Sequence, residues 1–160
     1  MKKLLTLFLA PILMLPLCSC LSVDYTYRDA VIDSLPKYTS EVFYTSGGFQ
    51  DYTDYAKYTY DSIPIENFET SEYFSAVTEK DVEEILLYLE NFESWVETVG
   101  GELKDNYDFD KTVVRVGDFF YIETKYGQPI GDGTYDKFDN YDIYYFDIDA
   151  QILYYLHNNI

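Results

Sequence analysis

The chain has 160 residues, of which 29 are Asp or Glu and 11 are Lys or Arg, so its formal net charge at pH 7 is −18. This acidity disfavours nucleic acid and anionic membrane surfaces as partners, because both require basic side chains to neutralise phosphate. A single histidine and two cysteines argue against a zinc site of the usual kind.

The N-terminal segment has the three-part organisation of a secretory signal peptide. Two lysines precede an apolar run over residues 4–17, and the small residue Ser19 stands directly before Cys20. About 20 apolar residues are needed to cross a bilayer. This run is shorter and two prolines interrupt it, so we interpret it as a cleaved signal and not as a transmembrane anchor.

The four residues Leu17, Cys18, Ser19 and Cys20 resemble the lipobox of bacterial lipoproteins. The resemblance implies that the Cys20 thiol receives a diacylglycerol and becomes the first mature residue, although Cys18 departs from the Ala, Ser or Thr usual at its position. A plain secretory peptide is the alternative, but it gives no reason for Ser-Cys at the cleavage junction. The expected location is the extracytoplasmic face of the cell membrane.

Cleavage before Cys20 would remove two lysines and no acidic residue, which moves the net charge from −18 to −20. A protein of this charge must be held at the membrane by its lipid, and two or more acyl chains give stable attachment. The predicted organisation is a signal peptide (1–19), a lipidated tether (20–28) and one α+β domain (29–160).

Hydrophobic spacing predicts one long helix over residues 79–99. Thr78 is the expected N-cap, and glycines at 100 and 101 are expected to end the helix. A short helix over 28–35 should stop at Pro36. The apolar face of the long helix consists of Val82, Ile85, Leu86, Leu89, Phe92 and Val96.

Six segments rich in β-branched and aromatic residues predict strands. Together with the helix they favour an α+β fold: an antiparallel sheet of five or six strands with one long amphipathic helix packed on one face. The last four segments should form a meander, and 52–56 is also compatible with a short helix. The six segments are 41–45, 55–60, 112–116, 119–125, 141–149 and 152–157.

No constellation in the sequence selects a catalytic residue, a metal site or a cofactor. His157 is the only histidine and stands three residues from the C-terminus, where a fraying strand is a poor place for a catalytic triad. We interpret it as an ordinary strand histidine. The acidic clusters lack the glycine required at position six of a calcium loop, and no motif selects a carboxylate pair for hydrolysis.

Tyrosine is unusually abundant, at 19 residues. Tyrosine is enriched at protein interfaces, but it also suits a sheet with one solvated face, and both interpretations stay open. The predicted binding residues are Tyr126, Tyr135, Tyr144 and Tyr155, the first two of which flank a glycine-rich loop.

The leading functional hypothesis is a non-catalytic binding or interaction module, and the layout resembles the small acidic lipoproteins of uncharacterised function in low-GC Gram-positive bacteria. Its partner would be a protein or a cell-envelope glycan. A second hypothesis is an immunity or inhibitor protein that masks a basic toxin or enzyme. A third and weaker one is a carboxylate-based hydrolase.

Overall fold

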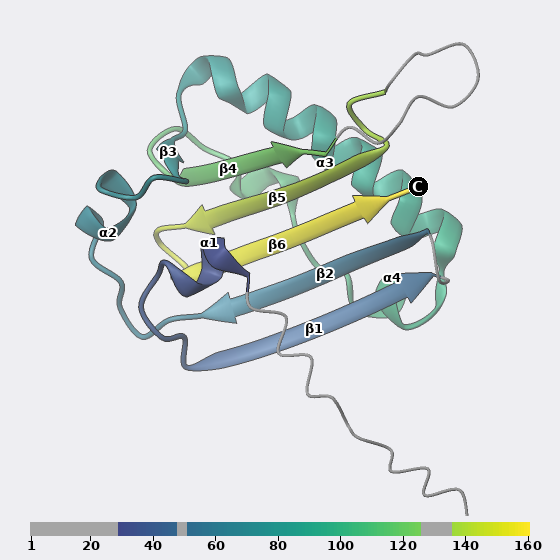
Figure 1. Cartoon of the computed structure of the whole chain (residues 1–160), viewed down its shortest axis with the longest axis horizontal. Coiled ribbons are helices and arrows are strands. Elements are labelled where there is room, and N and C mark those ends of the chain that lie inside the picture. The colour runs from purple at the N-terminus through teal and green to yellow at the C-terminus, as the bar shows by residue number, and fades with distance from the viewer. Residues whose placement is uncertain (1–28, 48–50, 126–135) are drawn as a thin grey trace, which may run out of the picture.

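A computed structural model describes residues 29–47, 51–125 and 136–160 as a six-stranded antiparallel sheet with helices (Figure 1). The order of the strands across the sheet is β1-β2-β6-β5-β4-β3. Their bounds are β1 Ser40–Gly47, β2 Tyr52–Thr59, β3 Ser75–Ala76, β4 Phe119–Thr124, β5 Asn140–Asp147 and β6 Ile152–Asn159. The α+β class and the strand number agree with the sequence prediction.

The last strand, β6, lies in the middle of the sheet and not at its edge. It pairs with β2 on one side and with β5 on the other. The run β4-β5-β6 forms a meander, whereas the two-residue strand β3 returns to the outer edge of β4. The C-terminal strand is therefore held by hydrogen bonds along both of its edges.

The long helix α3 spans Glu79–Val99, as its hydrophobic spacing predicts. The amide and the hydroxyl of Thr78 both donate to the Asp81 carboxylate, at 2.8 and 2.6 Å. Gly100 ends the helix with a φ of 63°, a conformation that costs glycine little, and the short helix α4, Gly101–Asn106, follows directly. The buried residues of α3 are Ile85, Tyr88, Leu89, Phe92 and Val96.

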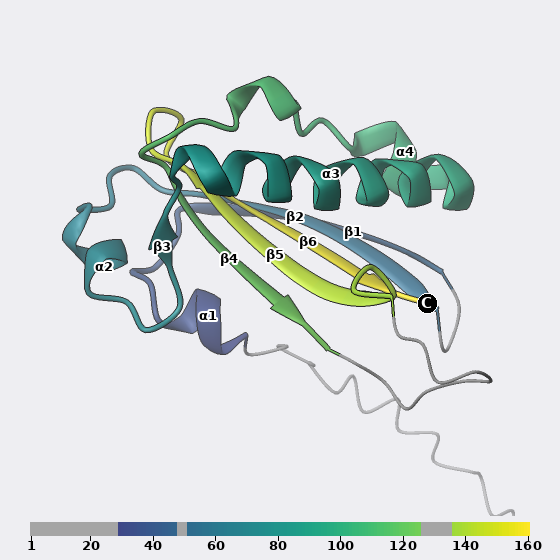
Figure 2. The same ribbon diagram turned by 90° about the horizontal axis from the view of Figure 1, so that it is seen from above.

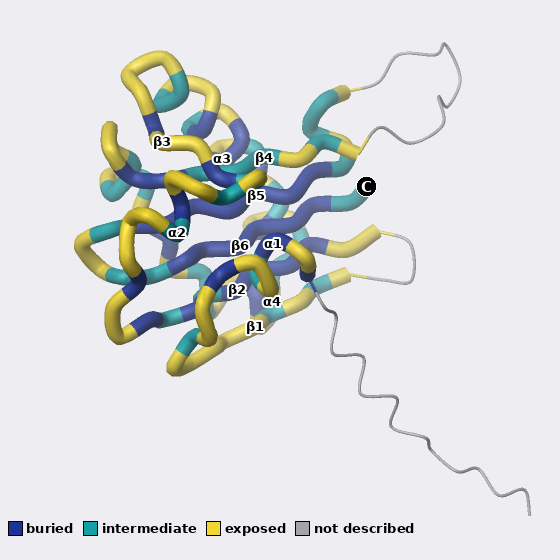
Figure 3. The backbone as a smooth tube through the Cα atoms, turned by 60° about the vertical axis from the view of Figure 1, so that its left-hand side comes forward, coloured by how far each residue is buried: buried dark blue, intermediate teal, exposed yellow. Residues whose placement is uncertain are grey.

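Buried side chains form one cluster on each face of the sheet. In Figure 2, α3 and α4 lie along one face, and α1 (Ala30–Asp33) lies on the other. Val31 of α1 and Phe68 of α2 (Glu66–Glu69) belong to this second cluster. Both faces of the central strands are consequently buried, which Figure 3 shows as a dark band through the middle of the fold.

Two local predictions are corrected by the structure. Residues 112–116 were expected to form a strand, but a 3₁₀ turn, Lys111–Val113, occupies this region, because the Asp110 side chain accepts from the Thr112 amide at 2.9 Å. Such local side-chain bonds compete with strand pairing. Residues 52–56, for which a helix was an alternative, lie in β2.

None of the helices in the described ranges is long and apolar enough to cross a membrane. The predicted signal peptide and tether, and the loop over 126–135, lie outside the residues that the structure describes.

Candidate functional site

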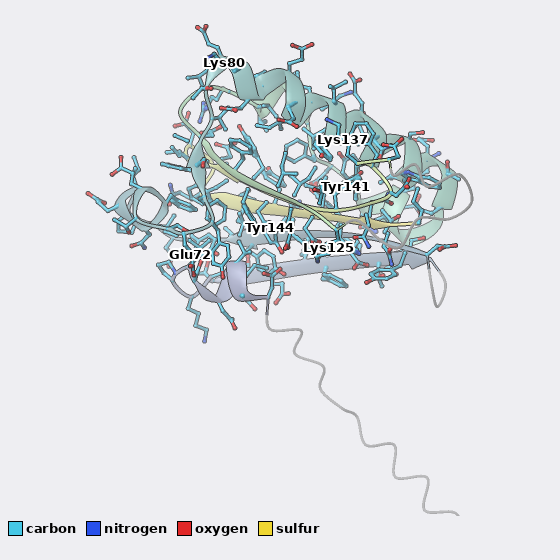
Figure 4. The ribbon with its side chains drawn as sticks, turned by 45° about the horizontal axis from the view of Figure 1, so that its top comes forward. Glu72, Lys80, Lys125, Lys137, Tyr141 and Tyr144 are labelled. Carbon is cyan, nitrogen blue, oxygen red and sulfur yellow. The ribbon has the colours of Figure 1, made fainter. Side chains whose placement is uncertain are left out.

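Seven tyrosines of β2, β5 and β6 are buried, so these residues do not form the solvated tyrosine-bearing sheet face that the composition allows. Tyr141 is completely buried on the α3 face and Tyr144 is 3% exposed on the opposite face (Figure 4). The buried tyrosines of β2, β5 and β6 are Tyr55, Tyr58, Tyr141, Tyr144, Tyr145, Tyr154 and Tyr155. They divide between the two clusters, four on the α3 face and three on the other.

The hydroxyl groups of several of these tyrosines donate hydrogen bonds to aspartate side chains. Three of the hydroxyls that donate to carboxylates are those of Tyr55 to Asp108 (2.7 Å), Tyr145 to Asp118 (2.6 Å) and Tyr155 to Asp142 (3.0 Å). Tyr144 donates to Asp29 in the same way. A buried hydroxyl requires such a partner, so the acidic and tyrosine-rich composition is in part a property of the core.

The most polar part of the core is a row of side chains that crosses three neighbouring strands. Strand register places Asp54 of β2 opposite His157 of β6, and His157 opposite Asp142 of β5. These three side chains, which we call the polar row, are 9%, 4% and 1% exposed respectively. Paired positions on adjacent strands share one face, so all three lie on the face away from α3.

Asp142 is the centre of this row. Its Oδ1 lies 2.6 Å from His157 Nδ1 and accepts from the Tyr155 hydroxyl, while Oδ2 accepts from the Lys125 ammonium. Burial by itself opposes ionisation of Asp142, but the hydrogen bonds from His157 and Lys125 outweigh burial and lower the pKa of this carboxyl. Asp142 is therefore a well-partnered buried carboxylate.

Asp54, at the other end of the polar row, is poorly partnered. Among the described residues, neither Asp54 Oδ1 nor His157 Nε2 has a hydrogen-bond partner. Burial raises the pKa of Asp54, and its interactions with Thr45 and His157 offset this only in part. A buried carboxylate with an unpartnered oxygen lowers the stability of the folded protein when it is ionised.

An imidazole with a carboxylate at Nδ1 and a free Nε2 is the arrangement of a general base. In this protein the Nε2 atom is buried and the ring of Tyr52 lies over the imidazole, with the ring centroids 4.8 Å apart. A reacting group would have to displace Tyr52, which is 37% exposed. The sequence did not predict the pair, because His157 was expected near the fraying C-terminal end of the last strand.

The predicted binding residues fall into two groups. Tyr144 and Tyr155 are brought together, with ring centroids 5.0 Å apart, but both are buried, at 3% and 5% exposure. Tyr126 and Tyr135, like the predicted lipidation residue Cys20, lie outside the described residues. Contact of these tyrosines with a partner stays a prediction.

An open groove lies elsewhere, beside the outer edge of β4. Its volume is about 490 Å³, and residues of α3, β3 and β4 form its walls. Lys137 reaches into it, paired with Glu84 at 3.6 Å and placed 4.9 Å from the centre of the Tyr88 ring. The lining residues are Tyr73, Ser75, Glu84, Tyr88, Phe120, Tyr121, Ile122, Thr124 and Lys137. We call this site the edge groove.

Within the described ranges, no three histidine, cysteine or acidic side chains are grouped so that they could hold a metal ion. Comparison of the chain with protein-family models, with curated proteins and with solved structures finds no match in any of the three.

Proposed function

We propose that this chain is a membrane-anchored extracytoplasmic lipoprotein, held by lipid on Cys20, whose domain is a non-catalytic binding module. The observation that carries the binding role is the edge groove, an open site of about 490 Å³ with several aromatic side chains in its walls. Tyrosine supplies rigid contact area together with a hydroxyl, which is why it is enriched at binding surfaces.

The edge groove supports this function better than the polar row supports catalysis. The polar row contains the one histidine of the chain paired with a carboxylate, and its three side chains are at least nine-tenths buried. Most side chains that line the edge groove are instead exposed or partly exposed, among them Tyr73 and Tyr121. A ligand can reach the edge groove without rearranging the core.

The surface charge favours a basic protein over a glycan as the partner. Helix α3 carries five exposed glutamates against one exposed lysine, Lys80, and one of these glutamates, Glu84, lines the edge groove. The glutamates are Glu79, Glu83, Glu84, Glu90 and Glu97. Opposite potentials speed encounter and select partners, so inhibition of a basic toxin or enzyme is the second candidate function.

Calorimetric titration of the full-length chain in mild detergent tests the proposal. We expect binding of polylysine, used as a basic probe, to weaken markedly between about 0.05 and 0.5 M salt, because the Debye length shrinks over this range. Binding of soluble peptidoglycan fragments by stacking would change little. If the chain bound neither probe, the binding role would be contradicted. Turnover of a glycan or peptide that depends on one carboxylate of the chain would contradict the non-catalytic role.

A further inference from the structure

Among the residues that the structure describes, strand pairing covers only the first half of the outer edge of β4. Strand β3 pairs with Phe119 and Phe120 and with nothing beyond them. Among the described residues, no strand continues this pairing along Ile122 and Thr124. The second half of β4 is therefore an open strand edge, and such edges are templates for pairing with another chain.

The hydrogen-bond pattern shows which main-chain groups this edge presents. The Lys125 amide donates inward, to the Asn140 carbonyl at 2.8 Å, whereas the Asp118 carbonyl faces outward and accepts from Val77 at 2.7 Å. Inward and outward groups alternate along an antiparallel strand. The N–H and C=O groups of Ile122 and Thr124 consequently face the open edge.

The edge groove runs beside these groups. Ile122 and Thr124 both line it, and Glu84 and Tyr88 of α3 form the facing wall. An added strand would alternate its side chains between this wall and the opposite face, where Tyr121 lies. Main-chain bonds would supply affinity and the alternate pockets would supply specificity.

We propose that the open half of β4 and the edge groove bind an extended segment of a basic protein, which adds to the sheet as a strand alongside Ile122 and Thr124. This inference rests on the proposed binding function and specifies its partner. The cationic character follows from the net charge of −18 and from the two exposed carboxylates at this site, Glu84 in the groove wall and Glu123 on the edge itself. The cation in the groove, Lys137, is already paired with Glu84.

A lysine-threonine alternating peptide of about eight residues, the length of an ordinary strand, is a suitable probe. The full-length chain in detergent is titrated with it while amide signals are followed by NMR. We expect the largest shifts at Ile122 and Thr124. Two further peptides carry N-methyl groups on alternate amides: one is methylated at the odd-numbered residues and the other at the even-numbered residues. In an added strand only every second amide faces β4 and donates to it. Strand addition therefore requires that one of the two methylated peptides does not bind and that the other binds like the unmethylated peptide.

Two substitutions at one position complete the test. Thr124→Pro removes an outward-facing N–H, which an edge strand tolerates, and we expect it to weaken peptide binding about tenfold, the equivalent of one main-chain hydrogen bond. Thr124→Val keeps the N–H and should bind like the unmodified chain. If the peptide fails to bind, or binds with shifts confined to other strands, or binds equally to both variants, the strand-addition inference is wrong. Retained salt-sensitive polylysine binding would then leave the binding function standing.

Discussion

His157 Nδ1 lies 2.6 Å from Asp142 Oδ1, across the two central strands β6 and β5. A carboxylate only accepts hydrogen bonds, so Nδ1 carries the hydrogen; on the other side of β6, the residue of β2 paired with His157 is Asp54. His157 is thus hydrogen-bonded to the well-partnered Asp142, whereas its paired position on the other side holds the poorly partnered Asp54. This difference gives two predictions of opposite sign.

Asp142→Asn should destabilise the protein at pH 7 by about 1 to 3 kcal/mol, because the uncharged amide leaves one acceptor oxygen, in place of two, for Lys125, Tyr155 and His157. The pKa of Asp142 is lower in the folded protein than in the unfolded chain. The ionised Asp142 therefore makes its full contribution to the free energy of unfolding above about pH 4, the usual pKa range of Asp. This contribution is lost as the pH falls through the lower pKa of the folded protein. Urea unfolding of both proteins at pH 7 and pH 3 should show the difference shrinking in acid.

Asp54→Asn should leave stability at pH 7 unchanged or raise it by up to about 1 kcal/mol, because the ionised carboxylate is buried with one oxygen unpartnered. The folded pKa of Asp54 is raised, so its ionisation weakens the fold above that pKa, and the penalty disappears as the pH falls below about 4. A loss of stability as large as that of Asp142→Asn would show that the ionised Asp54 stabilises the fold, which would contradict this prediction.

Tyr155→Ser should cost about 3 to 5 kcal/mol, the range for truncation of a buried aromatic side chain, since Tyr155 is 5% exposed and contacts the ring of Tyr144. Tyr155→Phe keeps the ring and removes only the hydrogen bond to Asp142, so it should cost about 1 kcal/mol. Thermal melting of the two variants checks the order. If the serine variant were as stable as the wild type and instead lost glycan binding, Tyr155 would be a contact residue after all.

Local pattern was enough to predict α3 and its two ends. Its hydrophobic spacing, the Thr78 cap and Gly100 act within a few residues of one another, and each is visible in the sequence. Tyr88 was missed on the buried face because tyrosine alone does not indicate burial. The predicted strand at 112–116 failed for a related reason, since β-branched residues favour a strand only where a neighbouring strand can pair with them.

Strand order could not be predicted, and the candidate sites depend on it. The C-terminal position of His157 suggested a fraying strand, yet β6 lies between β2 and β5 and buries it. The edge groove likewise depends on the return of β3 to the outside of β4 and on its ending after two residues. Contacts between segments that are distant in sequence produce no hydrophobic periodicity in the sequence from which they could be predicted.

The two faces of α3 give a matched pair of stability predictions. Leu89 is completely buried, so Leu89→Ala should cost about 2 to 5 kcal/mol. The neighbouring Glu90 is exposed, with only a 4.0 Å contact to Lys111, and Glu90→Ala should cost well under 1 kcal/mol. Chemical denaturation of the full-length chain compares them directly, and similar midpoints for the two variants would contradict the assignment of the faces.

The proposed membrane anchor is tested at Cys20, with Cys18 as the control. Cys20→Ala should abolish lipidation and release the protein from the membrane, whereas Cys18→Ala should do neither, because only Cys20 follows a small residue at the expected cleavage junction. Metabolic labelling with a fatty-acid probe, followed by fractionation, measures both effects. A chain of net charge −18 has no electrostatic attraction to anionic lipid that would retain it once the acyl chains are missing. Labelling of the Cys20→Ala variant at the wild-type level would overturn the assignment of the anchor.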